Sequence, residues 1–485
     1  MNPIIDRMRR TLAAQRKAFL DHPYPSLAER KKKLRALKEL LRRYQEQIVV
    51  AVDADFGGRS ATETKLVEVM GPILEANHAL SSLRRWMRPQ RRHTELLFLT
   101  NSAHVEYQPK GVVGIIAPWN FPLFLALGPL LAALAAGNRA MIKMSELSPR
   151  MTELLAKMLG EVFPEDEVAV FGGEVEEAQA FSKLHFDHIV FTGSPAVGRH
   201  VMKAASENLV PVTLELGGKS PALVGPDADF ADAAKRIAHG KALNSGQVCL
   251  APDYALVARG SEMRFAEAVA NAFRRMYPTT AGNVDYTAMA SDRHAQRMGE
   301  LIADAEAKGG RVIAAGDGAG RRIALRIVTG VRDDMRIAQE EIFGPILPIM
   351  SYDSLDGAIA YVNSRPRPLG FYVFGLNDRA LASLKRRTHA GGMSINDWGW
   401  HAFNHDLPFG GVGNSGMGSY HGVEGFRELS HAKAVYRRHR FFPVGLFYPP
   451  YGGIVPRLAM RMYLGKANAA APVAGRLPGE ARSPG

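Results

Sequence analysis

The chain alternates from residue 111 onward between short apolar segments and longer segments, and this alternation limits its possible folds more than any other feature. Four of the short segments have the length and composition of buried strands: 112–117, 139–143, 168–171 and 188–191. The intervening segments 123–136 and 148–162 are long enough for helices. Strands that alternate with helices predict a parallel sheet with helices on both faces.

A second alternating region predicts a second α/β unit. Its strands and helices are expected at 220–224, 254–257, 262–276 and 294–308. A chain of 485 residues is long enough for two or more core-forming units, and we place the main boundary near residue 215. Residues 1 to about 90 have apolar side chains at helical spacing, whereas 94–107 and 432–438 are expected to be extended. The segment from about residue 466, rich in Ala, Pro, Gly and Ser, is expected to be disordered.

The net charge of +13 is found in some proteins that bind nucleic acid or anionic lipid. The basic residues are nevertheless spread along the chain, and no zinc-finger or helix-turn-helix pattern is present. We interpret them as a solvated basic surface that attracts anionic cofactors. The uncharged stretch 112–137 contains several prolines, unlike a membrane-spanning helix. Without a secretory signal pattern, and with a single cysteine, the protein is expected to be cytoplasmic.

Cys249 is the only cysteine of the chain, so it cannot form an internal disulfide, a multi-cysteine zinc site or a redox pair. Two interpretations remain for this residue taken alone. It is either a small buried hydrophobic side chain or a lone nucleophile. No metal site is expected.

Polar residues follow two of the predicted strands. Asn120 lies between Trp119 and Phe121, and its amide NH2 group is suited to stabilising an oxyanion. Lys143 and Glu146 follow the next strand, at the end where open parallel sheets bind ligands. Both of these side chains can bond ribose hydroxyls. The alternative interpretations are a turn asparagine and a surface ion pair.

Two further segments carry glycines, and one of them also has a carboxylate. Gly193 and Ser194 follow a strand, and Gly198 leads into a helix, an arrangement that suits a diphosphate although the spacing is not G-x-G-x-x-G. Glu215 precedes a double glycine. A partly apolar pocket would disfavour its charged form and raise its pKa toward that of a useful general base. The alternative is a capping glutamate.

Taken together, these segments resemble the aldehyde dehydrogenase superfamily. The matching segments occur in the order of the family: PWNFP at 118–122, IKMSE at 142–146, FTGSPAVG at 191–198, ELGGKSP at 215–221, NSGQVC at 244–249, EEIFGP at 340–345 and PFGGVGNSGMG at 408–418. The resemblance covers roughly residues 25 to 440 and is strongest to the class 3 branch. Within that branch the chain is similar to bacterial coniferyl aldehyde dehydrogenases. Met144 departs from the pattern, because the branch usually has proline there.

The resemblance implies roles for the matching residues. Cys249 would be the nucleophile, Asn120 an oxyanion donor together with the backbone N–H of Cys249, and Glu215 the base that activates water. The implied cofactor contacts are Trp119 beside the cofactor, Lys143 and Glu146 at the adenosine ribose, Gly193 and Ser194 with the following Gly198 at the diphosphate, and Glu341 and Phe343 at the nicotinamide ribose.

The resemblance also implies the domain organisation and the partners. It predicts a Rossmann-type cofactor domain (1–92 and 110–214), an α/β catalytic domain (215–408), bridging and oligomerisation segments that form a small sheet (93–109 and 409–440), and a C-terminal tail (441–485). The expected cofactor is NAD, with NADP also usable. The expected partners are a small aldehyde and a second copy of the chain in a homodimer. Nucleic acid is not expected as a partner. Membrane contact is not expected either, because prolines interrupt the apolar patches of the tail.

The substrate stays open at this point. We favour an aromatic aldehyde such as coniferaldehyde, and the first alternative is a long-chain aliphatic aldehyde. A CoA-acylating semialdehyde dehydrogenase is a further alternative, but Glu215 argues against it because CoA would replace activated water. From a different class comes a non-catalytic, basic membrane- or nucleic-acid-binding protein. The presence of Cys249, Asn120 and Glu215 together argues against that interpretation.

Overall fold

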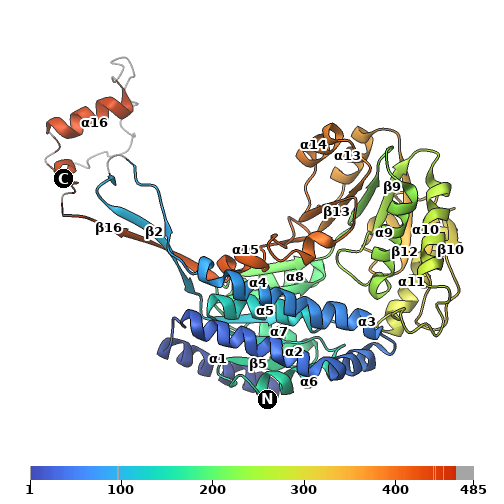
Figure 1. Cartoon of the computed structure of the whole chain (residues 1–485), viewed down its shortest axis with the longest axis horizontal. Coiled ribbons are helices and arrows are strands. Elements are labelled where there is room, and N and C mark those ends of the chain that lie inside the picture. Colours follow the sequence, from blue (N-terminus) through green and yellow to red (C-terminus); the bar gives the residue numbers. More distant parts are fainter. Residues whose placement is uncertain are drawn as a thin grey trace, which may run out of the picture. The chain divides into compact units, whose positions relative to one another are not determined.

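The computed structural model describes residues 2–95, 98–440, 442, 444–449, 451 and 453–465 (Figure 1). The chain divides into two units. The larger unit comprises Met1–Arg88 and Glu106–Lys433, and the smaller comprises Pro89–Val105 and Ala434–Gly485. The segment 466–485, which was expected to be disordered, lies outside the described residues.

A six-stranded sheet of the larger unit has the strand order β15-β7-β6-β3-β4-β5. Its strands are β3 (Val112–Ile116), β4 (Arg139–Lys143), β5 (Val168–Phe171), β6 (His188–Gly193), β7 (Val212–Leu216) and β15 (Gly416–Met417). All neighbours pair in parallel except β15, which is antiparallel to β7. The chain passes from β3 through β4 to β5 and then returns to β6 on the other side of β3. Open α/β sheets bind ligands at such a reversal, outside the carboxyl ends of the strands.

Helices cover both faces of this sheet. One face carries α1 (Pro3–Asp21), α7 (Val175–Ser182) and α8 (Pro195–Ser206), and the other carries α5 (Phe124–Ala136) and α6 (Pro149–Gly160). Behind α5 and α6 lie α2 (Leu27–Phe56), α4 (Gly71–Trp86) and the short α15 (Gly422–Glu428), as Figure 1 shows. Two short elements connect α2 to α4: α3 (Ala61–Glu63) and the π-helix η1 (Thr64–Met70).

Local sequence explains where the main helices begin and end. Helix α2 starts at a capping box, in which Ser26 and Glu29 each bond the other's backbone N–H. It ends at Gly57, which adopts the left-handed conformation that glycine accepts without a Cβ clash. Every residue of α5 is buried, which is why this helix is apolar on all sides.

A seven-stranded sheet, also in the larger unit, has the order β10-β11-β12-β9-β8-β13-β14. Its strands are β8 (Pro221–Val224), β9 (Tyr254–Ala258), β10 (Arg311–Ala314), β11 (Arg326–Thr329), β12 (Ile346–Tyr352), β13 (Gly370–Phe374) and β14 (Gly392–Ile395). Only β10 is antiparallel to its neighbour. Helices α9 (Phe230–Ala242) and α10 (Glu262–Met276) pack on one face of this sheet, and α13 (Leu355–Asn363) and α14 (Asp378–Arg387) pack on the other. The other helices of this region are α11 (Asp292–Ala307), α12 (Arg336–Gln339), η3 (Leu243–Gly246) and η4 (Trp400–Phe403).

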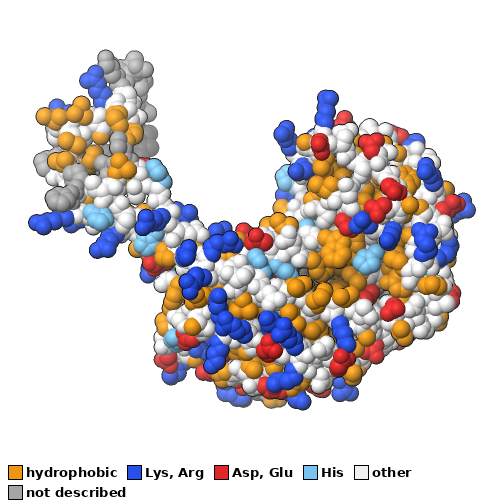
Figure 2. Space-filling model, viewed as in Figure 1, with side chains coloured by type: hydrophobic (Ala, Val, Ile, Leu, Met, Phe, Trp, Pro, Cys, Tyr) orange, Lys and Arg blue, Asp and Glu red, His pale blue; other side chains and the backbone are white. Residues whose placement is uncertain are grey.

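A third, small sheet has the order β1-β2-β16, with strands β1 (Gln90–Arg91), β2 (Ser102–Pro109) and β16 (Ser430–Arg437). Strands β2 and β16 each continue from one unit into the other, and the smaller unit contains η5 (Val444–Phe447) and α16 (Ile454–Leu464). Figure 2 shows hydrophobic side chains gathered over α16, and Ile454, Leu458 and Leu464 are all highly exposed in the single chain. None of the helices in the described ranges is long and apolar enough to cross a membrane.

The two parallel sheets with helices on both faces confirm the predicted α/β fold class. One local expectation was wrong. The stretch 94–107 is not extended throughout, because Phe98 to Thr100 form a turn before β2 begins. The apolar patches after residue 441 include the short helix α16, which tolerates Pro456 because it lies in the first turn. The predicted domain boundaries stay predictions.

Candidate active site

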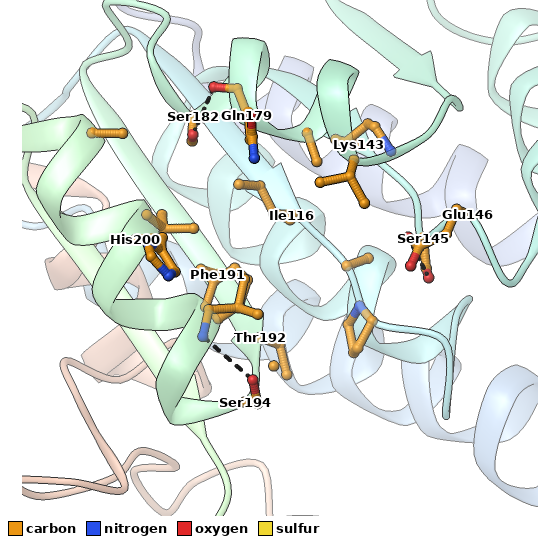
Figure 3. A pocket seen from close by; sticks show the side chains of 18 of the residues that line it. Ile116, Lys143, Ser145, Glu146, Gln179, Ser182, Phe191, Thr192, Ser194 and His200 are labelled. Atoms are coloured by element: carbon orange, nitrogen blue, oxygen red, sulfur yellow. Dashed lines mark hydrogen bonds between the residues drawn. The ribbon is translucent and has the colours of Figure 1, made fainter. Parts of the chain in front are cut away.

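A cavity of about 650 Å³ lies at the carboxyl ends of β3, β4 and β6, where the strand order reverses. Trp119, Lys143, Glu146, Gly193 and Ser194 line it, so five of the predicted cofactor residues meet around one space. In Figure 3, Lys143 and Glu146 lie on one side of the pocket, and Ser194 lies across from them.

Lys143 and Glu146 differ sharply in their surroundings. Lys143 is buried, and its ammonium group donates to the carbonyl oxygens of Met144 at 2.8 Å and Gly173 at 2.7 Å. Burial lowers the pKa of Lys143, and the charge of Glu146 opposes that effect. Glu146 is exposed and accepts a hydrogen bond from Ser145 at 3.2 Å. The lysine is therefore fixed, while the carboxylate faces solvent and is available to a ligand.

The glycine turn leads into α8. Ser194 is the N-cap of this helix, and its hydroxyl accepts from the backbone N–H of Val197. A side chain at Gly193 would meet the ring of Phe191 at 2.5 Å, so the turn needs glycine to pack this closely. Gly198 does not line the cavity. A Cβ there would lie 2.7 Å from the side chain of Leu216, so Gly198 lets α8 approach β7 rather than touch a ligand directly.

A second cavity of about 290 Å³ brings the predicted catalytic residues together. Asn120, Glu215 and Cys249 all line it, and so do Glu341 and Phe343. Its rim shares Trp119, Thr192, Gly193 and Ser194 with the larger cavity. The two cavities therefore adjoin, and the thiol of Cys249 lies in the smaller one.

The loop before Cys249 has an unusual backbone. Asn244, Ser245 and Gly246 all have positive φ, at 48°, 52° and 71°. For the two residues with side chains this conformation is strained, and it persists only where surrounding contacts hold it. The side-chain amide of Asn244 donates to the carbonyl oxygen of Gln247 at 3.1 Å, and the hydroxyl of Ser245 donates to the carbonyl oxygen of Thr287.

The thiol itself is partly exposed and strongly biased toward its protonated form. Burial, followed by the negative charges of Glu341 and Glu215, raises the pKa of Cys249 to about 12. In the resting protein this side chain is therefore a thiol at neutral pH, and its reaction as a nucleophile requires a base to take the proton.

Glu215 lies on β7 and is only 2% exposed. Neither of its carboxylate oxygens has a hydrogen-bond partner among the described residues. Burial raises the pKa of Glu215 well above the ordinary value. A buried carboxyl group without partners is costly to a fold, and such groups are common where they act on a ligand or water.

Asn120 is buried and has a fixed orientation. Its side-chain amide donates to the carbonyl oxygen of Gln247 at 3.1 Å. The backbone carbonyl oxygen of Asn120 accepts from the side chains of Arg59 at 2.6 Å and Asn244 at 3.2 Å. Because an amide NH2 group has two donors, one N–H of Asn120 stays available for a ligand in the cavity.

Glu341 and Phe343 stand on the loop before β12. Burial, then the charge of Asp253, raises the pKa of Glu341 to about 7. Phe343 has a positive φ of 51° and packs edge-on against Trp119, with ring centroids 5.5 Å apart. Trp119 thus links this loop to the end of β3.

The sequence analysis missed several residues around this site. His294 and Arg297 line the smaller cavity, and Arg297 donates to the carbonyl oxygens of Glu341 at 2.8 Å and Ile342 at 2.6 Å. Their three-residue spacing on α11 places them on one helix face, which was the only signal available. Tyr420 is fully buried near the site, and its pKa is raised by burial and then by Glu215.

Comparison with known proteins decides the family. The model of the "Aldehyde dehydrogenase family" matches residues 6–435. The chain belongs to the aldehyde dehydrogenase family. A probable coniferyl aldehyde dehydrogenase of Pseudomonas aeruginosa is 47% identical over 461 residues, which cover 95% of this chain and 97% of that protein. The predicted class of enzyme, an NAD(P)-dependent aldehyde dehydrogenase, is thereby confirmed.

Solved structures of this family share the fold. The substrate-bound state of Staphylococcus aureus AldH superimposes with a TM-score of 0.89 at 35% identity, covering 96% of this chain and 100% of that one. The indole-3-acetaldehyde dehydrogenase AldA of P. syringae, in complex with NAD+ and IAA, gives a TM-score of 0.82 at 28% identity, with 90% and 89% covered. The aldehyde dehydrogenase fold, with its Rossmann-like and catalytic parts, is thus confirmed.

Proposed function

We propose that this aldehyde dehydrogenase oxidises an aromatic aldehyde of the coniferyl type to its acid through a thioester on Cys249. The observation that carries the proposal is that Cys249, Asn120 and Glu215 line one cavity. They supply a thiol, an amide donor and a carboxyl group without partners among the described residues. These groups match the needs of the reaction: a nucleophile, a donor to the oxyanion and a base for water.

In the first step the sulfur of Cys249 bonds to the aldehyde carbon, and the carbonyl electrons move onto oxygen. The free N–H of the Asn120 amide and the backbone N–H of Cys249 stabilise that oxyanion. Because the pKa of the thiol is about 12, its proton must pass to a base as the bond forms. Glu341 and Glu215, whose charges act on the thiol, are the candidates for this base.

Oxidation converts the thiohemiacetal on Cys249 into a thioester, and the nicotinamide supplies the hydride acceptor for this step when the cofactor is bound. Water then attacks the thioester carbon while Glu215 takes its proton. The C–S bond breaks, the acid leaves and the thiol is restored. The burial that raises the pKa of Glu215 also makes its carboxylate basic enough for this proton transfer.

The residues around the larger cavity fit a dinucleotide. The N-terminus of α8 after Ser194 suits a diphosphate, and Glu146 suits ribose hydroxyls. Glu341 and Phe343 would hold the nicotinamide ribose in the adjoining cavity. A 2′-phosphate would be repelled by Glu146, whereas Lys143 would attract it, so we propose that NAD is preferred and that NADP is usable.

The substrate class is supported by the Pseudomonas aeruginosa relative, whose similarity extends over nearly the whole of both chains. An apolar rim at Pro118 and Leu125 around the smaller cavity suits an aromatic ring. The test is kcat/KM for coniferaldehyde, benzaldehyde, hexanal and a long-chain aldehyde with the purified enzyme. We expect coniferaldehyde to have the highest value. A higher value for the long-chain aldehyde would refute the substrate, and no NADH with any aldehyde would refute the function.

The finer organisation belongs to the same proposal. We propose a cytoplasmic homodimer with a cofactor domain at 1–92 and 110–214, a catalytic domain at 215–408 and oligomerisation segments at 93–109 and 409–440. The exposed apolar side chains of α16 support a protein partner for the tail. Sedimentation of the full chain tests this assembly, and a monomer at micromolar concentration would refute it.

A further inference from the structure

The segment from Arg59 to Glu68 contacts the loops of the candidate active site, yet none of its residues lines the cavity around Cys249. Arg59 comes first. Its guanidinium donates to the backbone carbonyl oxygen of Asn120 at 2.6 Å. The same group lies over the rings of Phe56 and Phe121, at 4.5 and 4.8 Å from their centroids. With its side chain wholly buried, Arg59 has little freedom to move away from Asn120.

Glu68 contacts the other end of the same turn. Its carboxylate accepts from the backbone N–H groups of Leu123 at 3.0 Å and Phe124 at 2.8 Å. The other carboxylate oxygen lies 3.5 Å from the Arg59 guanidinium, and both side chains are fully buried. The ion pair thus bonds the backbone carbonyl of Asn120 through Arg59 and the backbone amides of Leu123 and Phe124 through Glu68, and so fixes the turn on both sides.

The π-helix η1, which follows Glu63 directly and contains Glu68, explains how the segment from Arg59 to Glu68 reaches two loops. In an α-helix, Glu63 and Glu68 would point about 140° apart, since 3.6 residues make one turn. The wider π-helix of Thr64–Met70 lets both carboxylates face the site. Glu63 accepts from the backbone N–H of Asn244 at 3.1 Å and from the hydroxyl of Thr287 at 2.7 Å, beside the loop that carries the thiol.

A buried ion pair contributes little net stability, because the cost of removing both charges from water offsets their attraction. It does restrict geometry, and a donor to an oxyanion must be held within about 0.5 Å of its place. We propose that Arg59 and Glu68 are positioning residues that orient the amide of Asn120 toward the oxyanion. The proposal rests on the function proposed above for Asn120.

A double-mutant cycle between Glu68→Gln and Asn120→Ala tests this inference, with the burst rate of NADH formation as the readout. Glutamine keeps the shape of the side chain and one acceptor but loses the charge that pairs with Arg59. A misplacement of about 1 Å can cost roughly 10²-fold in rate. We therefore expect Glu68→Gln to lower the burst rate about tenfold or more in the wild-type background. In the Asn120→Ala background it should change the rate less than about twofold, because the positioned group is gone.

Controls separate positioning from a general effect on the fold. Glu167→Gln removes the charge of a partly buried ion pair with Lys33, remote from the cavity, and should leave the burst rate unchanged. Thermal unfolding and NADH binding by fluorescence are measured for every variant. Arg59→Lys gives an independent cycle if Glu68→Gln does not fold, because lysine keeps the charge but loses the planar fork. It should show the same non-additivity.

The outcomes are distinct. Equal losses from Glu68→Gln with and without the Asn120 amide would overturn the positioning role, since the pair would then support the whole site. An unchanged burst rate for Glu68→Gln, with a large loss for Asn120→Ala, would overturn the positioning role alone. An unchanged rate for Asn120→Ala would overturn the proposed role of Asn120 and the positioning inference with it.

Discussion

Replacing Glu215 by glutamine should separate the two halves of the proposed reaction. The carboxyl group is 2% exposed and has no hydrogen-bond partner among the described residues, so an amide of nearly the same shape fits its space. The amide cannot take a proton from water. Loss of a general base costs about 10²–10⁴ in rate, or about 3–5 kcal/mol at the barrier to thioester hydrolysis. Formation of the thioester does not require Glu215 if another carboxylate, Glu341, takes the proton of the thiol.

The assay is rapid mixing of enzyme and NAD with excess aldehyde, followed by NADH absorbance. We expect a burst of about one NADH per active site and then a steady state slower than wild type by roughly 10²–10⁴. Cys249→Ala is the matched control and should give no burst. Full steady-state turnover by Glu215→Gln would contradict the reasoning and would assign the base to Glu341.

The same substitution is expected to stabilise the fold at neutral pH. Burial raises the pKa of Glu215 in the folded chain, so its charged form is disfavoured there relative to the unfolded chain. The wild type carries no such penalty below the unfolded pKa of about 4.3, and it loses stability as pH rises toward the folded pKa. The advantage of Glu215→Gln should therefore be larger at about pH 7 than at about pH 5. Denaturant unfolding at both pH values checks this, and an advantage that shrinks with rising pH would refute it.

Three further substitutions test the remaining groups. Cys249→Ala should abolish turnover while NAD binding in calorimetry stays close to wild type; more than a few per cent of residual turnover would exclude it as the nucleophile. Asn120→Ala should lower kcat by roughly 10² or more, as loss of one oxyanion donor does; a change in KM alone would mean that the residue only shapes the pocket. Glu146→Gln should raise kcat/KM for NADP relative to NAD, and an unchanged ratio would show that the carboxylate does not meet the ribose.

Much of the fold could be predicted because short apolar strands alternate with longer helices. The bounds expected for β4, β5 and α10 agree with the structure. The candidate site followed from the same pattern, since polar residues at the ends of parallel strands meet at one edge of a sheet. Asn120 was found in this way, whereas Glu215 was singled out by the double glycine after it and by the family resemblance.

Residues that act through the backbone of others could not be predicted. Arg59 and Glu68 meet the turn after β3 only through tertiary packing, and nothing in their local sequence distinguishes them from surface charges. Arg297 holds the loop of Glu341 by bonding carbonyl groups, which every residue possesses. Gly198 shows the opposite case, because its spacing suggested a ligand contact whereas its position serves helix packing.

The protonated state of Cys249 also bears on chemical damage. Peroxide oxidises thiolates rather than thiols. Many electrophiles that alkylate proteins likewise react with the thiolate form. With a pKa near 12, the resting thiol holds only a minute thiolate fraction at neutral pH. The resting thiol should therefore react slowly with peroxide and with alkylating agents. In the proposed mechanism, Cys249 reacts where a carbonyl group lies within reach of the Asn120 amide and a carboxylate can accept the proton.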